Sequence, residues 1–565
     1  MRIAVQKEAH LRGLKPQENG KKGGYMRKIF NLFAAAIISL VAVSCDKEEH
    51  LPDNHKDIIL RASISNSATK TSLDDKVNGQ YPVLWSADDQ IAVFQGDAIF
   101  KFDLIEGDGT TTGTFQLDRN SSVEVEFSEE APFTAVYPYS AAQKESGGTV
   151  IYKAPSIQNY VDNSFATRVS PMYANNDNSA SVLTFTNIFS ILKLNIKGVA
   201  GEKVQEIQVG SNMPLAGDVQ LGSPAFSYKN SAYNITLNCG EGVDISQVED
   251  FVIVIPPHSA MQLAIVITTD KGSYYKAATS DVTMTAGNIL SMREIDLGGE
   301  GSAQRSLMSI KYPEDNANGV FVGTKVWANV NCGYDDGHPY GLLYQWGRKY
   351  GQGYGSETPG VVNIDGYNNE DHHKGPLSSA EEGSSEDLKN NFYYHVDDWL
   401  ATRDNTLWNT NTTDNKEVYP IKNYSCDPCP VGWRVPTMSE LEGLSVKKSD
   451  WTQNNNQSGY WFSGNVEYSN DAVAVFFPAA GARSYWDGGL GSERGELGLY
   501  KSSTALNTDG WVASACLVFE SYYFETGDRR KAEGASVRCV KDQTNIPASG
   551  AGTGGYENGG ENLEW

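Results

Sequence analysis

The sequence lacks the short motifs that mark common catalytic sites. It contains no Gly-x-Ser-x-Gly nucleophile elbow, no His-Glu-x-x-His zinc motif and no phosphate-binding P-loop. The glycines of GQGYG at 351–355 follow no strand–helix–strand unit, so they do not indicate a dinucleotide site. Carboxylate pairs such as Asp397 and Asp398 occur, but a sequence cannot set the separation that a glycosidase needs. These absences favour a protein that binds rather than an enzyme.

Basic residues are also scarce. The 565-residue chain has 46 Lys and Arg against 70 Asp and Glu, which argues against nucleic acid as a partner. Cys426 and Cys429 have the spacing of a zinc or redox pair, but no second pair follows. Asp371, His372 and His373 could touch a metal, yet they lie in an acidic polar loop. We therefore expect no metal and no cofactor.

No apolar run reaches the roughly 20 residues that a transmembrane helix needs. The longest candidate spans 29–43, follows the basic pair Arg27 and Lys28, and ends at Ser44 and Cys45. A basic start, a short apolar stretch and a small residue before the cleavage point predict a signal peptide at 26–44. Residues 1–25 are interpreted as an upstream translation start.

The segment AVSC at 42–45 resembles a bacterial lipobox, in which Cys45 receives the lipid, including palmitate, and becomes the new N-terminus. Two or three acyl chains hold a protein firmly on a membrane. Lys47, Glu48 and Glu49 resemble the surface-export signal of Bacteroidetes lipoproteins, with a solvated tether as the alternative. Residues 45–56 are a lipidated tether on either interpretation.

Residues 57–298 have the pattern of β-strands throughout. Leu192, Leu194 and Ile196 alternate with polar residues, which predicts a sheet with one dry face. Runs at 263–269 and 274–278 flank Asp-Lys-Gly, a hairpin signal. An Asn-rich break near 176–181 divides the region into two expected β-sandwiches, at 57–178 and 179–298.

The same region resembles the fimbrillin family of Bacteroidetes. Its motifs, in order, are TKTS at 69–72, LWSADDQIAVF at 84–94, FTAVYP at 133–138, LTFTN at 183–187 and AGN at 286–288. The resemblance implies tandem transthyretin-like sandwiches and assembly with other fimbrial subunits by β-strand complementation. Trp85 is expected to be a core residue.

A flexible linker is expected at 299–307, and beyond it the composition changes, because nine of the 11 Trp fall between 308 and 542. The motifs KVWANVNCGY (325–334), LYQWGR (343–348), DPCPVGWRVPT (427–437), FFPAAG (476–481) and SVRCV (536–540) resemble the Fibrobacter succinogenes major paralogous domain. That resemblance implies an α+β, C-type lectin-like domain at 308–542. Lys501 departs from the family, which usually has an aromatic there.

Two further features follow from these motifs. Thr437 and Glu440 fit a capping box, which predicts a helix at about 437–445. The lectin-like resemblance implies a disulfide between Cys429 and Cys539, with Cys332–Cys429 as the rival pairing. Residues 543–565 are Gly-rich and are expected to be a disordered tail.

The candidate ligand contacts are aromatic residues in Gly-rich or polar segments after this helix, where lectin-like folds carry their ligand loops. They are Tyr485, Trp486, Tyr500, Trp511, Tyr522 and Tyr523. Flat rings stack on sugars and anchor protein interfaces, although core packing is the alternative for each of them. Trp327, Trp346 and Trp433, inside the strong motifs, are expected to be core. Calcium-bridged sugar binding is not supported, because the lectin calcium motifs are absent.

The sequence as a whole predicts a lipid-anchored outer-membrane protein on the cell surface, with a glycan or a host or bacterial surface protein as its ligand. A fimbrial tip subunit or a lone adhesin is the leading hypothesis. A polysaccharide-capture lipoprotein is one alternative. The other is an enzyme related to formylglycine-generating enzymes, for which Cys426, Cys429, Cys516 and Cys539 are the candidate set.

Assembly depends on the first strand of the N-terminal sandwich. In fimbrillin-like subunits, protease removes this strand and a neighbour's strand fills the groove. Here the matching strand is IILRASI at 58–64, and the basic residue at the usual cleavage place is Lys70 rather than Arg. An arginine-specific protease should find no good site, so the strand is expected to stay in place.

Overall fold

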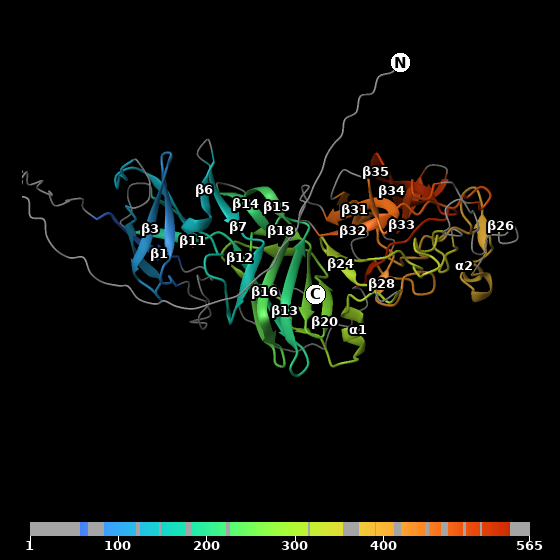
Figure 1. Ribbon diagram of the computed structural model, residues 1–565, viewed down its shortest axis with the longest axis horizontal. Helices are drawn as coiled ribbons and strands as arrows, with labels where there is room; N and C mark the ends of the chain where they lie inside the picture. The colour runs from blue at the N-terminus through green and yellow to red at the C-terminus, as the bar shows by residue number, and fades with distance from the viewer. Residues whose placement is uncertain are drawn as a thin grey trace, which may run out of the picture. The chain divides into compact units, whose positions relative to one another are not determined.

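A computed structural model describes residues 57–65, 84–119, 125–145, 149–176, 182–221, 226–314, 317–353, 372–389, 391–411, 420–446, 451–464, 473–489, 493–508 and 511–542. These residues belong to one compact unit that begins at Asp57, and the fold is mainly β (Figure 1). The signal peptide, Cys45, the 47–49 motif, Lys70, Asp371 and the tail lie outside the described residues. Within these ranges, no helix is long and apolar enough to cross a membrane.

The first domain is a closed barrel. In pairing order, its strands are β1 (Ile59–Ile64), β11 (Leu183–Asn187), β10 (Met172–Asn176), β5 (Phe133–Tyr137), β2 (Gln90–Gln95), β3 (Ala98–Glu106) and β4 (Thr112–Leu117). Neighbours run antiparallel except β1 and β11, which are parallel. Because β1 pairs on both of its edges, it closes the ring, so the strands of the first expected sandwich pair as a closed barrel.

Trp85 is a core residue of this barrel, as expected. It is 1% exposed and makes edge-to-face contacts with Phe115, Tyr137 and Phe185 at centroid distances of 4.9, 5.8 and 5.5 Å. The motif around it also supplies Asp89, whose carboxylate accepts hydrogen bonds from Tyr137 Oη at 2.8 Å and from the Ser86 amide at 2.7 Å. The LWSADD sequence is therefore structural here.

The expected boundary at 178/179 is wrong. The Asn-rich break falls between β10 and β11, which are antiparallel partners in the same barrel. Conversely, four strands that precede β10 in the sequence do not belong to the barrel and pair in sheets of the second domain. They are β6 (Ala142–Lys144), β7 (Val150–Ala154), β8 (Ile157–Val161) and β9 (Ser164–Phe165). Polar breaks in the sequence mark turns, but they do not reveal which sheet receives the next strand.

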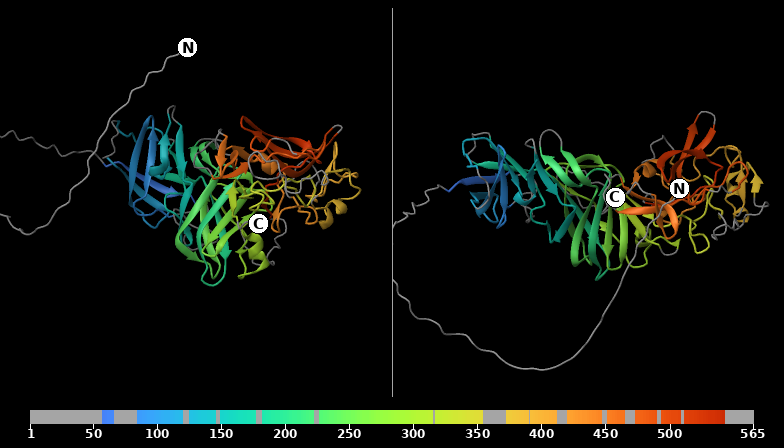
Figure 2. Two further views of the ribbon diagram at one scale, coloured as in Figure 1. Left: turned by 45° about the vertical axis from the view of Figure 1, so that its right-hand side comes forward. Right: turned by 45° about the horizontal axis from the view of Figure 1, so that its top comes forward.

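The second domain contains the remaining strands up to residue 296. They are β12 (Ser190–Lys197), β13 (Lys203–Ser211), β14 (Ala216–Leu221), β15 (Ser227–Ala232), β16 (Asn234–Asp244), β17 (Glu249–Ile255), β18 (His258–Met261), β19 (Leu263–Thr269), β20 (Gly272–Ala277), β21 (Val282–Met284), β22 (Ile289–Ser291) and β23 (Ile295–Asp296). One sheet has the order β20-β19-β13-β16-β8-β9, and another has β17-β12-β22 with β23 beside β12. Smaller sheets are β15-β14-β7-β6 and β18-β21. Figure 2 shows the strands of this domain, mostly in green, from two further sides.

Two sequence patterns in this domain are confirmed. Leu192, Leu194 and Ile196 of β12 are fully buried, whereas the residues between them are partly exposed. β19 and β20 form the hairpin predicted around Asp270–Gly272, with Thr269 opposite Gly272. Gly272 has a φ of +147°, a conformation that favours glycine.

Strand β19 is buried on both faces. Leu263, Ile265 and Ile267 belong to the core of the second domain, while Ala264 and Val266 belong to a core that is otherwise C-terminal. A strand covered on both sides needs a continuous apolar run, and LAIVI at 263–267 is such a run. The second and third domains therefore share one sheet as a common wall.

The expected flexible linker at 299–307 is wrong, because this stretch contains helix α1 (Ala303–Met308), capped by the Ser302 side chain. Arg305 donates to both carboxylate oxygens of Glu202, at 2.8 and 2.7 Å, and also to Tyr274 Oη. Burial disfavours the charged form of Glu202, but the hydrogen bonds from Arg305 outweigh it and hold the pKa of Glu202 below its usual value. Glycine-rich composition did not reveal this buried ion pair.

Close backbone contact completes the junction between the second and third domains. Tyr275 Oη donates to the Thr324 carbonyl at 2.7 Å. A Cβ placed on Gly210 would lie 2.1 Å from the Gly323 carbonyl oxygen and 2.7 Å from the Phe321 ring. A larger residue at 210 would therefore force the two domains apart.

The third domain is built from four small sheets. The first sheet is β24-β25-β36-β28 (Gly319–Val322, Lys325–Ala328, Val540–Lys541, Trp433–Arg434), and the second is β26-β27 (His372–Lys374, Phe392–Tyr394). The third sheet is β29-β31-β30 (Leu444–Val446, Gln457–Gly464, Thr452–Asn454), with β32 (Ala474–Pro478) paired to β31. The fourth sheet is β33-β34-β35 (Gly498–Thr508, Trp511–Glu520, Tyr523–Arg530). The first and last strands of this domain belong to the same sheet, in which β36 lies between β25 and β28.

The predicted capping-box helix is α3 (Met438–Glu442). Thr437 accepts the Glu440 amide and the Glu440 carboxylate accepts the Thr437 amide at 2.9 Å. Glu440 also receives two hydrogen bonds from Arg434, at 2.8 and 2.6 Å. The helix ends earlier than predicted, because β29 begins at Leu444. The sequence did not indicate α1, α2 (Ala380–Gly383), η1 (Tyr139–Ala141) or η3 (Glu386–Leu388).

We predict that Glu202→Gln destabilises the protein by about 3–5 kcal/mol, because it leaves Arg305 buried without a full counter-charge. Since the folded-state pKa of Glu202 is depressed, its contribution is present above the pKa of an unfolded Glu, about 4.3, and is lost as the pH falls through the lower folded value. Denaturant unfolding at neutral and acidic pH measures both effects. The exposed Glu241→Gln is the control; an equal effect of both substitutions would contradict the prediction.

Candidate functional site

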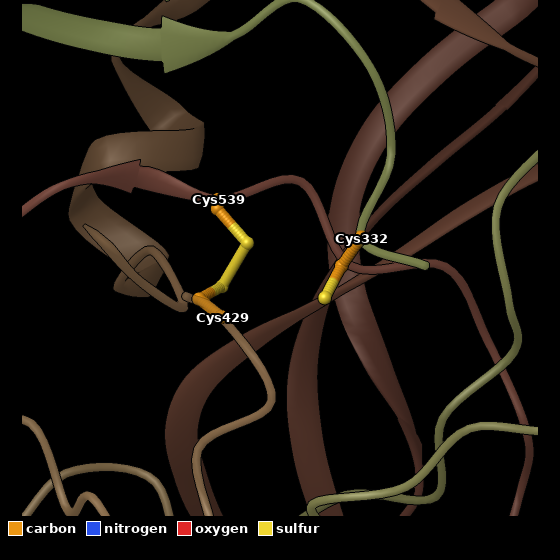
Figure 3. A group of neighbouring side chains, drawn as sticks. All are labelled: Cys332, Cys429 and Cys539. Carbon is orange, nitrogen blue, oxygen red and sulfur yellow. A yellow bond between two sulfur atoms is a disulfide. The ribbon is translucent and has the colours of Figure 1, made fainter. Parts of the chain in front are cut away.

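The two cysteines expected to pair lie at the centre of the third domain. Cys429 and Cys539 form a disulfide with an S–S distance of 2.08 Å, and Cys332 stays outside it (Figure 3). The bridge spans 110 residues and joins the loop before β28 to the start of β36. In the DPCP motif, buried Asp427 accepts the amides of Cys429 at 2.8 Å and Val435 at 3.0 Å, which fixes the loop.

The remaining thiols in the described part of the chain are buried. Cys332 is 1% exposed, and its sulfur lies 3.3 Å from Tyr344 Oη and 3.4 Å from the Pro428 carbonyl. Burial raises the pKa values of the Cys332, Cys426 and Cys516 thiols, and that of Cys239 to about 12. A reactive cysteine needs a lowered pKa and access. Cys426 is buried with a raised pKa, and Cys429 is bonded to Cys539, so these two cysteines do not form a reactive pair.

Metal ligation has little support in the described residues. The one group of three potential ligands found there is Cys332, Cys429 and Cys539, with sulfur atoms within 4.8 Å of one another, and two of these sulfurs form the disulfide. His372 and His373 lie in β26, but their side chains are outside the described set, as is Asp371.

An aromatic platform is formed by half-buried Tyr485 and exposed Trp486, in the loop after β32. Their ring centroids are 5.6 Å apart with a 32° tilt, and Trp486 is 65% exposed. The Arg530 guanidinium lies 4.8 Å from the Tyr485 centroid and donates to Asp397 at 2.8 Å. The platform therefore offers a flat apolar face beside paired charges, a combination suited to sugars and to protein surfaces.

A second aromatic pair lies at the β34–β35 hairpin. Tyr522 is 77% exposed, and its ring lies 5.1 Å from that of Tyr523, which is partly buried. Phe524 beside them is 40% exposed. These residues project at the tip of a hairpin whose register is fixed from Ala513 opposite Arg530 to Glu520 opposite Tyr523.

Two of the six candidate contacts do not join these surfaces. Tyr500 is fully buried, stacks on Phe519 at 5.8 Å and donates to the Pro478 carbonyl at 2.7 Å, so its assignment as a ligand contact is wrong. Its place in a β-strand facing the core explains the difference. Trp511 begins β34, but its side chain is outside the described set.

The core assignments in the strong motifs are confirmed, since Trp327, Trp346 and Trp433 are each at most 1% exposed. Lys501, at the position where an aromatic is usual, is also fully buried. Its ammonium donates to Ser514 Oγ at 3.2 Å and to the Arg530 carbonyl at 2.8 Å. Burial lowers the pKa of this amine.

Sequence reasoning missed a hollow of about 150 Å³ in the third domain, lined by both polar and apolar residues. Its lining includes Asn329, Asn331, Tyr334, Pro339, Asn454, Asn455, Gln457 and Arg538. Buried Arg538 holds its floor by donating to Asn331 Oδ1 at 2.8 Å and to the carbonyls of Ala328 and Phe476 at 3.0 Å. The signal in the sequence was the amide-rich run QNNNQ at 453–457, which looks like an ordinary turn.

Comparison with known proteins finds a family match for part of the chain. Residues 69–298 match the sequence model of the fimbrillin-like family. This part of the chain is fimbrillin-like. The match covers most of the first barrel and the second domain, and it ends before helix α1. The resemblance inferred from the LWSADD, FTAVYP and LTFTN motifs is thereby confirmed for these residues.

Several solved structures from Bacteroides are similar to this chain. A proposed cell adhesion protein from Bacteroides ovatus is 13% identical, covers 43% of this chain and 92% of its own, and has a TM-score of 0.30. One from Bacteroides uniformis is 16% identical, with 42% and 93% coverage and a TM-score of 0.27. A fimbrial protein from Bacteroides ovatus is 10% identical, with 86% and 99% coverage and a TM-score of 0.22. No curated protein matches the chain.

We predict that a thiol reagent labels none of Cys239, Cys332, Cys426 and Cys516 in the native protein within minutes, because all four are buried. After unfolding in denaturant without reductant, all four should react, while Cys429 and Cys539 should not. Peptide mapping of the labelled sites checks this pattern. Rapid native labelling of Cys426 or Cys516 would contradict it and favour the enzyme hypothesis.

Proposed function

We propose that this protein is a lipid-anchored surface adhesin or fimbrial tip subunit that presents its C-terminal domain to a ligand. The fimbrillin-like match supports a fimbrial or adhesive role on the cell surface. The observation that carries the finer proposal is the shared wall at β19, which joins the fimbrillin-like region to the third domain without a hinge. A ligand bound to the third domain would therefore transmit force directly to the anchored region.

The retained first strand supports a place at one end of a fimbria or alone on the surface. β1 pairs along its length with β4 and, through Ala62–Ile64, with β11. Arg61 is exposed, but its backbone is paired opposite Thr114 in the middle of the ladder. A protease needs an extended, unpaired segment, so Arg61 is a poor site while the barrel is folded. Loss of β1 would open a groove in the barrel where the side chains of Ala62 and Ile64 are now buried.

Ligand contact is proposed for the Tyr485–Trp486 platform, with the Tyr522–Tyr523 tip as a further contact. A 65% exposed Trp is costly to leave in water and gains free energy when a partner covers it. The neighbouring Arg530 and Asp397 supply hydrogen-bond partners at the edge of the rings. The ligand class that fits is a glycan or a host or bacterial surface protein.

We predict that Trp486→Ala weakens ligand binding at least about tenfold, because it removes the exposed ring on which a ligand would stack. A glycan and host-protein binding screen of the intact protein identifies a ligand, and titration of the variant measures the change. Val431→Ala removes another well-exposed apolar side chain outside the platform and serves as the matched control. Equal affinity of wild type and Trp486→Ala would rule out the platform.

We predict that the mature chain begins at acylated Cys45 and keeps β1. Mass analysis of the N-terminal peptide from membranes and from sheared fimbriae should find that start, and a chain beginning at Thr71 would show that the strand is lost. Lys47, Glu48 and Glu49 are proposed as the export signal, so their replacement by Ala should protect the protein from protease added to intact cells. Cys45→Ala should release it from the membrane.

A further inference from the structure

Lys531 is a fully buried lysine at the end of β35. Its ammonium nitrogen lies 4.0 Å from the centroid of the Trp346 ring, and Trp346 itself is fully buried. Lysine is almost never completely buried unless it is paired with a carboxylate. The environment of this amine therefore requires an explanation.

The hydrogen bonds of Lys531 within the described part of the chain go to carbonyl oxygens. Nζ lies 2.8 Å from Oδ1 of Asn405 and 3.4 Å from the Asp404 carbonyl. The Asn405 loop is held in place, because Asp404 Oδ1 accepts the Thr406 amide at 2.8 Å and its hydroxyl at 2.6 Å. The amine thus faces the side-chain carboxamide of a neighbouring loop.

Burial disfavours the charged forms of both Lys531 and Asp398. Burial lowers the pKa of Lys531 to about 8, despite attraction to Asp398 and Asp404. Asp398, which is 5% exposed, interacts with Lys531, and burial raises the pKa of its carboxyl group. A desolvated lysine with a lowered pKa is an activated nucleophile. A buried acid with a raised pKa can carry a proton at neutral pH.

We propose that Lys531 and Asn405 condense into an intramolecular isopeptide bond. The neutral amine attacks Cγ of Asn405, which is bonded to the Oδ1 atom that Nζ already contacts. The Nζ–Cγ bond forms, the Cγ–Nδ2 bond breaks, and one proton passes from Nζ to the departing nitrogen, which leaves as ammonia. No oxidant, reductant or co-reactant is required, because the reaction exchanges one amide for another.

Two other buried lysines show why this one is distinctive. Lys422 is 4% exposed and donates to the carbonyls of Cys429, Pro430 and Trp433, which engages all three of its protons. Lys501 is fully buried and bonds a hydroxyl and a backbone carbonyl. Lys531 is the one of these three whose amine contacts a side-chain carboxamide.

The cross-link can be detected by tryptic mapping of the unfolded, reduced and alkylated full-length protein. A linked Lys531 resists trypsin, so peptide 531–538 should appear joined to peptide 404–416, at their summed mass less one ammonia. The free peptides 404–416 and 532–538 should be lost. Cleavage after buried Lys501 should proceed normally, which shows that digestion of an unfolded buried lysine is complete.

The matched variant is Lys531→Arg, which keeps the charge and the hydrogen bond but cannot condense. It should release the free 404–416 peptide in full yield, and its intact mass should carry no ammonia loss. Wild-type protein that yields free 404–416 and is cut after Lys531 would overturn the proposal and leave an ordinary hydrogen bond. Because no ligand or cell surface enters this experiment, its result is independent of the proposed adhesive function.

Discussion

Burial of strand β19 on both faces is the constraint on which the rest of the structure depends. Alternate residues of Leu263–Thr269 serve two cores, so neither domain can bury its apolar surface without the other. Two apolar faces on one strand remove more surface from water than a sheet with one wet face, and each large buried aliphatic side chain contributes about 1.5–3 kcal/mol. The buried pair of Glu202 and Arg305 then fixes helix α1 against the same wall, so the connection between the domains has a defined geometry.

The rigid connection between the second and third domains bears on the role proposed for the Trp486 platform. In the proposed adhesin, force would pass from ligand to anchor through this connection, and a hinge at 299–307 would have allowed the third domain to swing. The Cys429–Cys539 bridge ties the middle of that domain to its last strand, so pulling on the chain cannot separate β36 from β28. The Trp486 platform belongs to a loop between β32 and β33, and its neighbour Arg530 ends β35. The proposed contact surface is thus supported by strands of the same domain.

Much of this architecture could be predicted from the sequence where the signal is local. The alternation in β12, the hairpin after Thr269 and the capping box at Thr437 depend on residues a few positions apart, and each is present. The domain boundary and the linker failed because they depend on long-range pairing: β7 joins β14, and Arg305 reaches Glu202 across 103 residues. In the candidate site, Trp486 is exposed whereas Tyr500 is buried. The sequence could not distinguish them, because the identity of an aromatic residue carries no information on its exposure.

Buried polar groups in the third domain hold its loops in place. Asp427, Arg538 and Lys422 are buried. Asp427 and Lys422 bond mainly backbone groups between Cys429 and Val435, and Arg538 donates to the carbonyls of Ala328 and Phe476. Groups committed in this way hold irregular loops in place, because loops of a domain with short strands cannot satisfy their own amides and carbonyls. Catalytic groups, in contrast, must be within reach of a substrate. The interior polarity of this domain therefore serves to fix loops, and the chemistry available to a ligand lies on the exposed aromatic and amide side chains that those loops present.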